Sequence, residues 1–224
     1  MRKKSIPSSF ARFLGTVVLF AYWPSFVGAE VTGAPDQATR CTINTYVSLC
    51  ASTLATFLLS GLGTDSARLR PADVQNASLA GGVGIGAIAR LEVLGPGGAL
   101  VVGLAAGALS TFGFATLQPR LLTAIGLHDT CGVHNLHGLP ALLSGAASAL
   151  LVAVSAPSDV FVHSEAAPLE RAGFQLLATL LTFVVSLGAG TVVGALASKA
   201  APRGDHYVTF HDSVGWDGDD HDAA

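Results

Sequence analysis

Ionisable side chains crowd into one short stretch of an otherwise apolar chain, "HDTCGVHNLHG" at residues 128–138. It holds three histidines, an aspartate and a cysteine, and a long hydrophobic run follows it. Histidine changes its charge near neutral pH, and it also ligates metals and relays protons. The stretch therefore indicates a functional site, and the helices around it must position these side chains.

Asp129 is a candidate helix N-cap, because a helix-compatible run follows it. A carboxylate in that position accepts backbone N–H bonds and faces the positive end of the helix dipole. A capping carboxylate at a membrane entrance also attracts cations. Capping and substrate recruitment are therefore compatible roles for Asp129, and the sequence leaves both open.

His134 and His137 lie three residues apart, so a regular α-helix would separate them by about 60° around its axis. Both are expected inside the membrane boundary, where an ionisable side chain is costly and usually faces a cavity or a partner. The structural alternative is that each histidine only bridges neighbouring helices by hydrogen bonds. The functional interpretation is favoured, because two histidines flank Asn135 in a segment without another charge.

Three kinds of chemistry fit this cluster. A metal site lacks a compact four-ligand face, because its ligands would be strung along more than two helical turns: His128, Asp129, Cys131, His134 and His137. Haem would need histidines from facing helices, whereas this segment holds all three histidines of the membrane region. A path for a small solute needs only one or two histidines in an apolar channel. We therefore expect conduction, with no metal and no cofactor.

Composition predicts the architecture that positions this cluster. Half of the residues are hydrophobic and 12% are charged, against about 25% charged in soluble domains. Crossing a bilayer takes roughly 20 apolar residues. Six stretches approach that length: 11–29, 41–62, 74–91, 97–117, 131–154 and 172–198. The fold class is thus all-α, a polytopic transmembrane helix bundle of about six spans, in which the third stretch is the most polar.

Basic residues predict the orientation, because they concentrate on the cytosolic side. With a cytosolic N-terminus, nine of the twelve lie inside, and the other three lie outside: Arg40, Arg90 and Arg171. We expect a cytosolic N-terminus at 1–10, a membrane domain at 11–200 and a cytosolic, disordered acidic tail at 201–224. A rival interpretation takes residues 1–29 as a cleaved secretory signal, since a basic start precedes a short apolar centre.

Several segments resemble one family, in the same order along the chain. "GLHDTCGVHNLHGLP" is similar to the signature segment of the Rhesus glycoproteins, the Rh branch of the Amt/Rh ammonium transporter superfamily. Consecutive Rh helices are resembled by "WPSF" at 23–26, "INTYVSL" at 43–49, "VQNASLAGGVGIGA" at 74–87 and "GALVVGLAAGALSTFGF" at 98–114. The resemblance covers roughly residues 11 to 200.

This resemblance implies two inverted sets of five helices around a narrow apolar pore, an added C-terminal helix, and three subunits with one pore each. It implies passive transport of ammonia or ammonium, with carbon dioxide as a further candidate solute, and no enzymatic activity. The pore histidine corresponds to His137, the aspartate to Asp129 and the gate phenylalanine to Phe26. His134 is a secondary pore-lining candidate.

The resemblance also implies that the chain corresponds to the C-terminal half of an eleven- or twelve-helix fold, from the sixth helix onward. The partner histidine and the other gate residue belong to the half that is not matched, so we expect an incomplete transporter. It should reside in the lipid bilayer, at the plasma membrane, as a homotrimer or with full-length relatives, and bind no nucleic acid. The alternative is a non-conducting interaction subunit or degenerate fragment that associates with full-length relatives.

Overall fold

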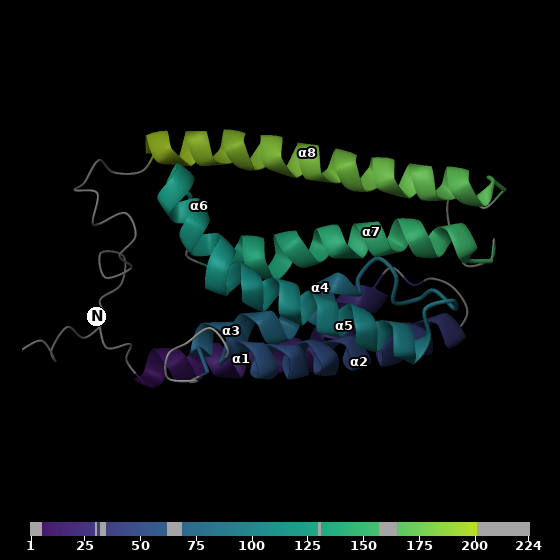
Figure 1. Cartoon of the computed structure of the whole chain (residues 1–224), viewed down its shortest axis with the longest axis horizontal. Helices are drawn as coiled ribbons and strands as arrows, with labels where there is room; N and C mark the ends of the chain where they lie inside the picture. The colour runs from purple at the N-terminus through teal and green to yellow at the C-terminus, as the bar shows by residue number, and fades with distance from the viewer. Residues whose placement is uncertain are drawn as a thin grey trace, which may run out of the picture. The chain divides into compact units, whose positions relative to one another are not determined.

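In the computed structural model the chain is helical, as the composition predicts, and no strand occurs in the part that the structure describes (Figure 1). That part comprises residues 6–29, 31, 35–61, 69–129, 131–156 and 165–200. The helices are α1 (Ile6–Gly28), α2 (Pro35–Ser60), α3 (Pro71–Asn76), α4 (Ala80–Gly84), α5 (Gly95–Phe112), α6 (Gln118–Ile125), α7 (Leu139–Val154) and α8 (Pro168–Ala200). Three short helices complete the set: the 3₁₀ helix η1 (Ala77–Leu79) and the π-helices η2 (Gly113–Leu117) and η3 (His134–Gly138).

The chain divides into two compact units, residues 1–180 and 181–224. Within the described residues, the second unit consists of the C-terminal part of α8. The predicted acidic tail at 201–224 lies outside the described residues.

Five helical stretches of the described chain are long and apolar enough to cross a membrane: Ala11–Gly28, Asp36–Ser60, Gly95–Ile125, His134–Val154 and Pro168–Lys199. They coincide with five of the six predicted spans. The remaining prediction, at 74–91, does not form one continuous helix. It consists instead of α3, η1, α4 and a series of turns, and it lies against α1, α2 and α5 in the interior of the bundle.

A buried polar stripe on α2 explains how the bundle tolerates this broken segment. Three side chains at four-residue intervals on α2 donate to carbonyl oxygens of the broken segment: Asn44 to Ala89 at 2.8 Å, Ser48 to Gly81 at 2.8 Å and Ser52 to Ala77 at 2.6 Å. A membrane interior offers no water to backbone groups that a broken helix leaves unpaired. The stripe therefore supplies the donors that the break requires.

Glycines bring α5 close to α2. A Cβ atom at Gly107 would lie 2.5 Å from the carbonyl oxygen of Ser52, and one at Gly103 would overlap the carbonyl oxygen of Ser48. Such close approach of backbones is typical of membrane helices that pack through small residues. The face of α5 that carries these glycines thus has no room for a larger side chain.

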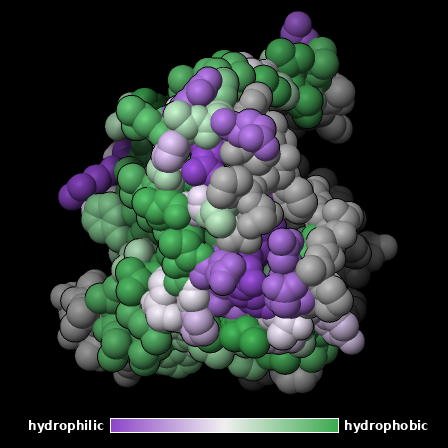
Figure 2. Space-filling view, turned by 90° about the vertical axis from the view of Figure 1, so that its right-hand side faces the viewer, coloured by the Kyte–Doolittle hydropathy of each residue, from purple (hydrophilic) through white to green (hydrophobic). Residues whose placement is uncertain are grey.

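The long helices of the first unit lie roughly parallel to one another and run between two ends of the bundle, left and right in Figure 1. At one end, α1 and α7 terminate while α2, α5 and α8 begin. Figure 2 views this end and shows hydrophilic side chains gathered between wide hydrophobic areas. An ion pair between Arg40 and Asp36 lies here, and Arg40 also donates to the carbonyl oxygen of Arg90 at 2.9 Å. The gathering of charge suits a membrane–water boundary.

Candidate functional site

His137 lies on the last turn of η3, beside the aromatic end of α1. Its ring stacks on Trp23 with ring centroids 6.4 Å apart and an angle of 18° between the planes. Trp23 in turn meets Phe26 edge-on, with centroids 6.2 Å apart and planes at 67°. Two segments more than 100 residues apart in sequence thus bring His137, Trp23 and Phe26 into one row.

The indole of Trp23 packs against α4 and against a buried hydrophobic cluster. A Cβ atom on Gly82 would collide with the ring, so α4 presses its bare backbone against the indole. Trp23 also packs against a buried cluster that includes Leu136 of η3. In contrast, His137 is exposed and Phe26 keeps 64% of its surface accessible. The row therefore has one side anchored in the bundle and one side open to a ligand or a further protein surface.

His134 and His137 do not share this environment. The prediction assumed a regular α-helix, which is wrong for this segment, because residues 134–138 form a π-helix. A π turn, closed by an i→i+5 hydrogen bond, holds more residues than an α turn. Side chains three residues apart therefore diverge by more than 60°. His137 faces Trp23, whereas His134 contacts the neighbouring Asn135.

Asp129 holds the start of this helical run. One carboxylate oxygen accepts the N–H of Val133 at 2.8 Å and the other accepts the N–H of His134 at 3.0 Å. These are among the first N–H groups of the run, which have no intrahelical partner. Their hydrogen bonds to a carboxylate are the interactions that a helix cap makes.

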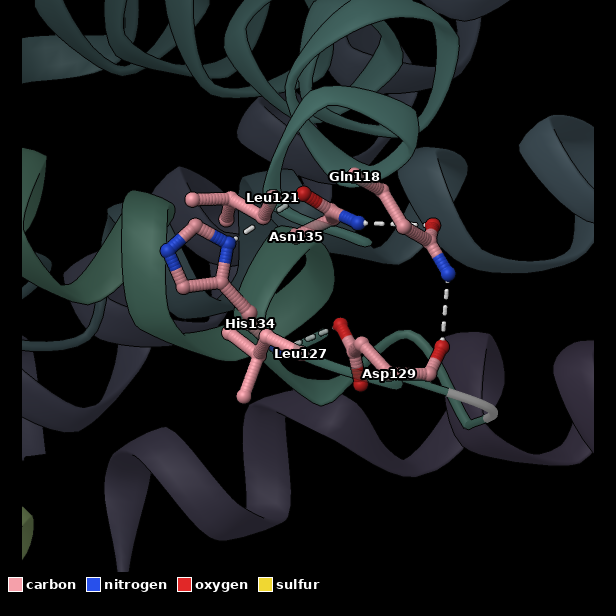
Figure 3. Close-up of a pocket in the computed structure, with 6 residues that line it drawn as sticks. All are labelled: Gln118, Leu121, Leu127, Asp129, His134 and Asn135. Carbon is pink, nitrogen blue, oxygen red and sulfur yellow. Dashed lines mark hydrogen bonds between the residues drawn. The ribbon is translucent and has the colours of Figure 1, made fainter. Parts of the chain in front are cut away.

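A chain of amide groups connects Asp129 to His134 (Figure 3). Gln118, the first residue of α6, donates to the carbonyl oxygen of Asp129 at 2.7 Å. Its own side-chain oxygen accepts from Asn135 at 3.0 Å, and the side-chain oxygen of Asn135 lies 3.3 Å from Nδ1 of His134. These four polar residues surround a cavity of about 10 Å³ together with Leu121 and Leu127. A cavity of that volume is about the smallest that can admit one water molecule.

The sequence suggested one cluster of polar residues, but in the folded chain they divide into two groups. His137 lies with Trp23 and Phe26, whereas His134 lies with Asn135, Gln118 and Asp129. Within the described residues, no three histidine, cysteine, aspartate or glutamate side chains come close enough together to hold a metal ion. Sequence reasoning missed Trp23 and Gln118 as neighbours of the two histidines. Trp23 stands in the quoted "WPSF" segment, whereas Gln118 carried no signal of its own.

Comparison with known proteins identifies the family of the chain. Residues 2–222 match the model of the Ammonium Transporter Family. The chain belongs to this family. With its long apolar helices, this member of the ammonium transporter family is an integral, multi-pass membrane protein.

Among its relatives, the chain is 39% identical to Ammonium transporter Rh type C of Oryctolagus cuniculus, over 84% of this chain and 42% of that protein. It is 34% identical to Ammonium transporter Rh type B of Takifugu rubripes, over 94% and 48% of the two chains. A solved structure of Nitrosomonas europaea Rh50, described as a channel of the Rhesus protein family, superposes with a TM-score of 0.72 at 35% identity. It aligns with 96% of this chain and 50% of its own. The chain thus spans about half the length of the relatives it matches.

Proposed function

We propose that this chain forms one wall of a pathway for ammonia or ammonium, with His137 as the group that contacts the solute. The observation that carries the proposal is the row formed by His137, Trp23 and Phe26, in which an imidazole is exposed within a membrane-spanning helix. An ionisable group within a membrane span is costly unless it lines a pathway or meets a partner. Membership of the ammonium transporter family indicates which solute to expect, ammonia or ammonium.

The chemistry of the row suits a small solute that can lose a proton. A neutral imidazole offers one donor and one acceptor nitrogen, so it can hydrogen-bond ammonia or relay a proton. Apolar surroundings make passage of a bare ammonium ion costly. The stacked indole of Trp23 restricts rotation of the His137 ring, and Phe26 restricts access at the end of the row.

Asp129 and His134 take supporting roles in this proposal. The Asp129 carboxylate secures the start of η3, and its charge attracts cations toward the same end of the bundle. His134 lies on another face of η3, so its contact with the solute is secondary to that of His137.

The assembly and location follow the same reasoning. We propose a homotrimer or a complex with full-length relatives in the plasma membrane, with no enzymatic activity. Carbon dioxide is a second candidate solute, because an apolar path does not discriminate against a neutral gas. The rival function is that of a non-conducting subunit, and the open side of the row favours it, since Phe26 and His137 could bind a relative there.

Uptake of methylammonium tests the proposal in cells that lack endogenous ammonium transporters. This chain is expressed alone, with a full-length Rh relative, or fused to the part of Nitrosomonas europaea Rh50 that it does not match. The fusion should take up methylammonium, and His137→Ala should reduce this uptake more than His134→Ala. A fusion that reaches the membrane without uptake, together with altered uptake by the co-expressed relative, would favour the non-conducting subunit.

A further inference from the structure

We propose that Gln118 and Asn135 form a directional hydrogen-bond relay that fixes His134 as its Nδ1–H tautomer and leaves Nε2 as an open acceptor. The relay runs from the backbone of Asp129 through two side-chain amides to the imidazole (Figure 3). Its direction is dictated at one end, and that direction determines which ring nitrogen carries the proton at the other.

The carbonyl oxygen of Asp129 fixes the direction, because a carbonyl can only accept. The amide nitrogen of Gln118 must therefore face it, which the 2.7 Å contact shows. The amide oxygen of Gln118 then faces Asn135 and accepts from its amide nitrogen at 3.0 Å. This turns the oxygen of Asn135 toward Nδ1 of His134. Since an amide oxygen only accepts, Nδ1 must hold the proton.

Reversing the relay would bring acceptors together. If the amide of Asn135 flipped alone, its oxygen would face the oxygen of Gln118. If both amides flipped, the oxygen of Gln118 would face the carbonyl oxygen of Asp129. Asn135 is fully buried, and a Cβ atom at Gly113 would lie 2.5 Å from its side-chain oxygen. The side-chain oxygen of Asn135 is thus packed against the backbone of η2.

The second ring nitrogen of His134 is left available. Within the described part of the chain, Nε2 of His134 makes no hydrogen bond. It is also not among the polar atoms that are buried without a hydrogen-bond partner. Figure 3 shows it on the side of the ring that faces away from Gln118 and Asp129. An unprotonated Nε2 accepts from N–H donors such as ammonia or ammonium. This last step, contact with the solute, rests on the proposed function, whereas the tautomer does not.

Nitrogen-15 NMR of the full chain in lipid nanodiscs tests the tautomer directly, because protonated and unprotonated ring nitrogens resonate far apart. The seven histidines are labelled, and His134 is assigned by its loss in His134→Gln. In the unsubstituted chain we expect a protonated Nδ1 and an unprotonated Nε2. Gln118→Met should change the ratio of the two tautomers by about tenfold, the effect of one ordinary hydrogen bond.

Two variants separate the relay from general disturbance of the fold. Gln118→Glu loses the hydrogen bond to the carbonyl oxygen of Asp129 but keeps an oxygen that accepts from Asn135, so it should retain the Nδ1–H tautomer. Gln175→Met makes the same methionine change on α8 and should leave His134 unchanged. The resonances of His137 serve as an internal reference, because its ring stacks on Trp23 and takes no part in the relay. A protonated Nε2 in the unsubstituted chain, or equal spectra for Gln118→Met and Gln118→Glu, would overturn the relay.

Ammonium chloride, compared with sodium chloride at the same ionic strength, tests the solute contact. We expect ammonium to shift the Nε2 resonance of His134 in the unsubstituted chain, and to shift it less in Gln118→Met. An unchanged Nε2 resonance would overturn the solute contact. Because the tautomer is read without transport, failure of the proposed function in the uptake assay remains distinguishable from failure of the relay.

Discussion

Replacement of Asp129 by alanine should weaken the start of η3 measurably without unfolding the bundle. The substitution removes two hydrogen bonds, from Val133 at 2.8 Å and from His134 at 3.0 Å. Loss of a helix cap typically costs about 1 kcal/mol, within a range of about 0.5–2 kcal/mol. Asp129 is half-buried, so water can reach part of the freed backbone. We therefore expect a loss of about 1–2 kcal/mol, below the sum of two charged hydrogen bonds at about 1.5–3 kcal/mol each.

Asparagine at this position should cost about half as much, because its single side-chain oxygen can still accept one of the two backbone bonds. Unfolding by sodium dodecyl sulfate in mixed micelles, followed by circular dichroism, measures both changes in the free energy of unfolding. Asp36→Ala is the matched control. Its carboxylate is 66% exposed and pairs with Arg40 on the surface, so its removal should cost less than about 1 kcal/mol.

Two results would refute this reasoning about Asp129. The first is a loss for Asp129→Ala no greater than that for Asp36→Ala, which would mean that the carboxylate contributes nothing as a cap. The second is an equal loss for Asp129→Asn and Asp129→Ala. That result would point to the charge, rather than the backbone hydrogen bonds, as the source of the stabilisation.

Two further predictions concern packing and topology. Gly107→Val should destabilise the bundle by about 3 kcal/mol, at the upper end for overpacking, because the new side-chain atoms meet the backbone of α2. A Cβ atom at Gly97 would have no neighbour within 4 Å, so Gly97→Val should cost far less in the same unfolding assay. Reporter fusions after Arg120 and after Lys199 should both report the cytosol, as the positive-inside rule predicts. A destabilised Gly97→Val with an unaffected Gly107→Val, or reporters on opposite sides, would contradict these predictions.

Much of the helical architecture could be predicted, because long apolar runs leave few alternatives in a bilayer. The break in the helix at 74–91 could not be predicted, for a physical reason. A window of apolar residues does not reveal where a helix breaks, since the break depends on donors elsewhere in the chain. The donors recur at every fourth residue of α2 as Asn44, Ser48 and Ser52, but several other polar residues of the same helix hide this pattern in the sequence.

The separation of the two histidines could not be predicted from their spacing. It depends on η3 being a π-helix, and the neighbouring contacts of that segment are tertiary. Asn135 packs against Gly113, and Gln118 reaches it from the start of α6. Neither neighbour is marked by local sequence. Identification of His137 and Phe26 depended on the family resemblance, whereas their common contact with Trp23 became apparent only in the folded chain.

The central claim is that the exposed imidazole of His137 lines the path of the solute. Stopped-flow measurement of ammonia entry into proteoliposomes tests it most directly, with the Rh50 fusion reconstituted as the unsubstituted chain, as His137→Ala and as His134→Ala at equal protein density. We expect faster alkalinisation of the interior for the fusion than for empty liposomes, a large change for His137→Ala and a smaller one for His134→Ala. Equal rates for the unsubstituted fusion and for His137→Ala would contradict the assignment.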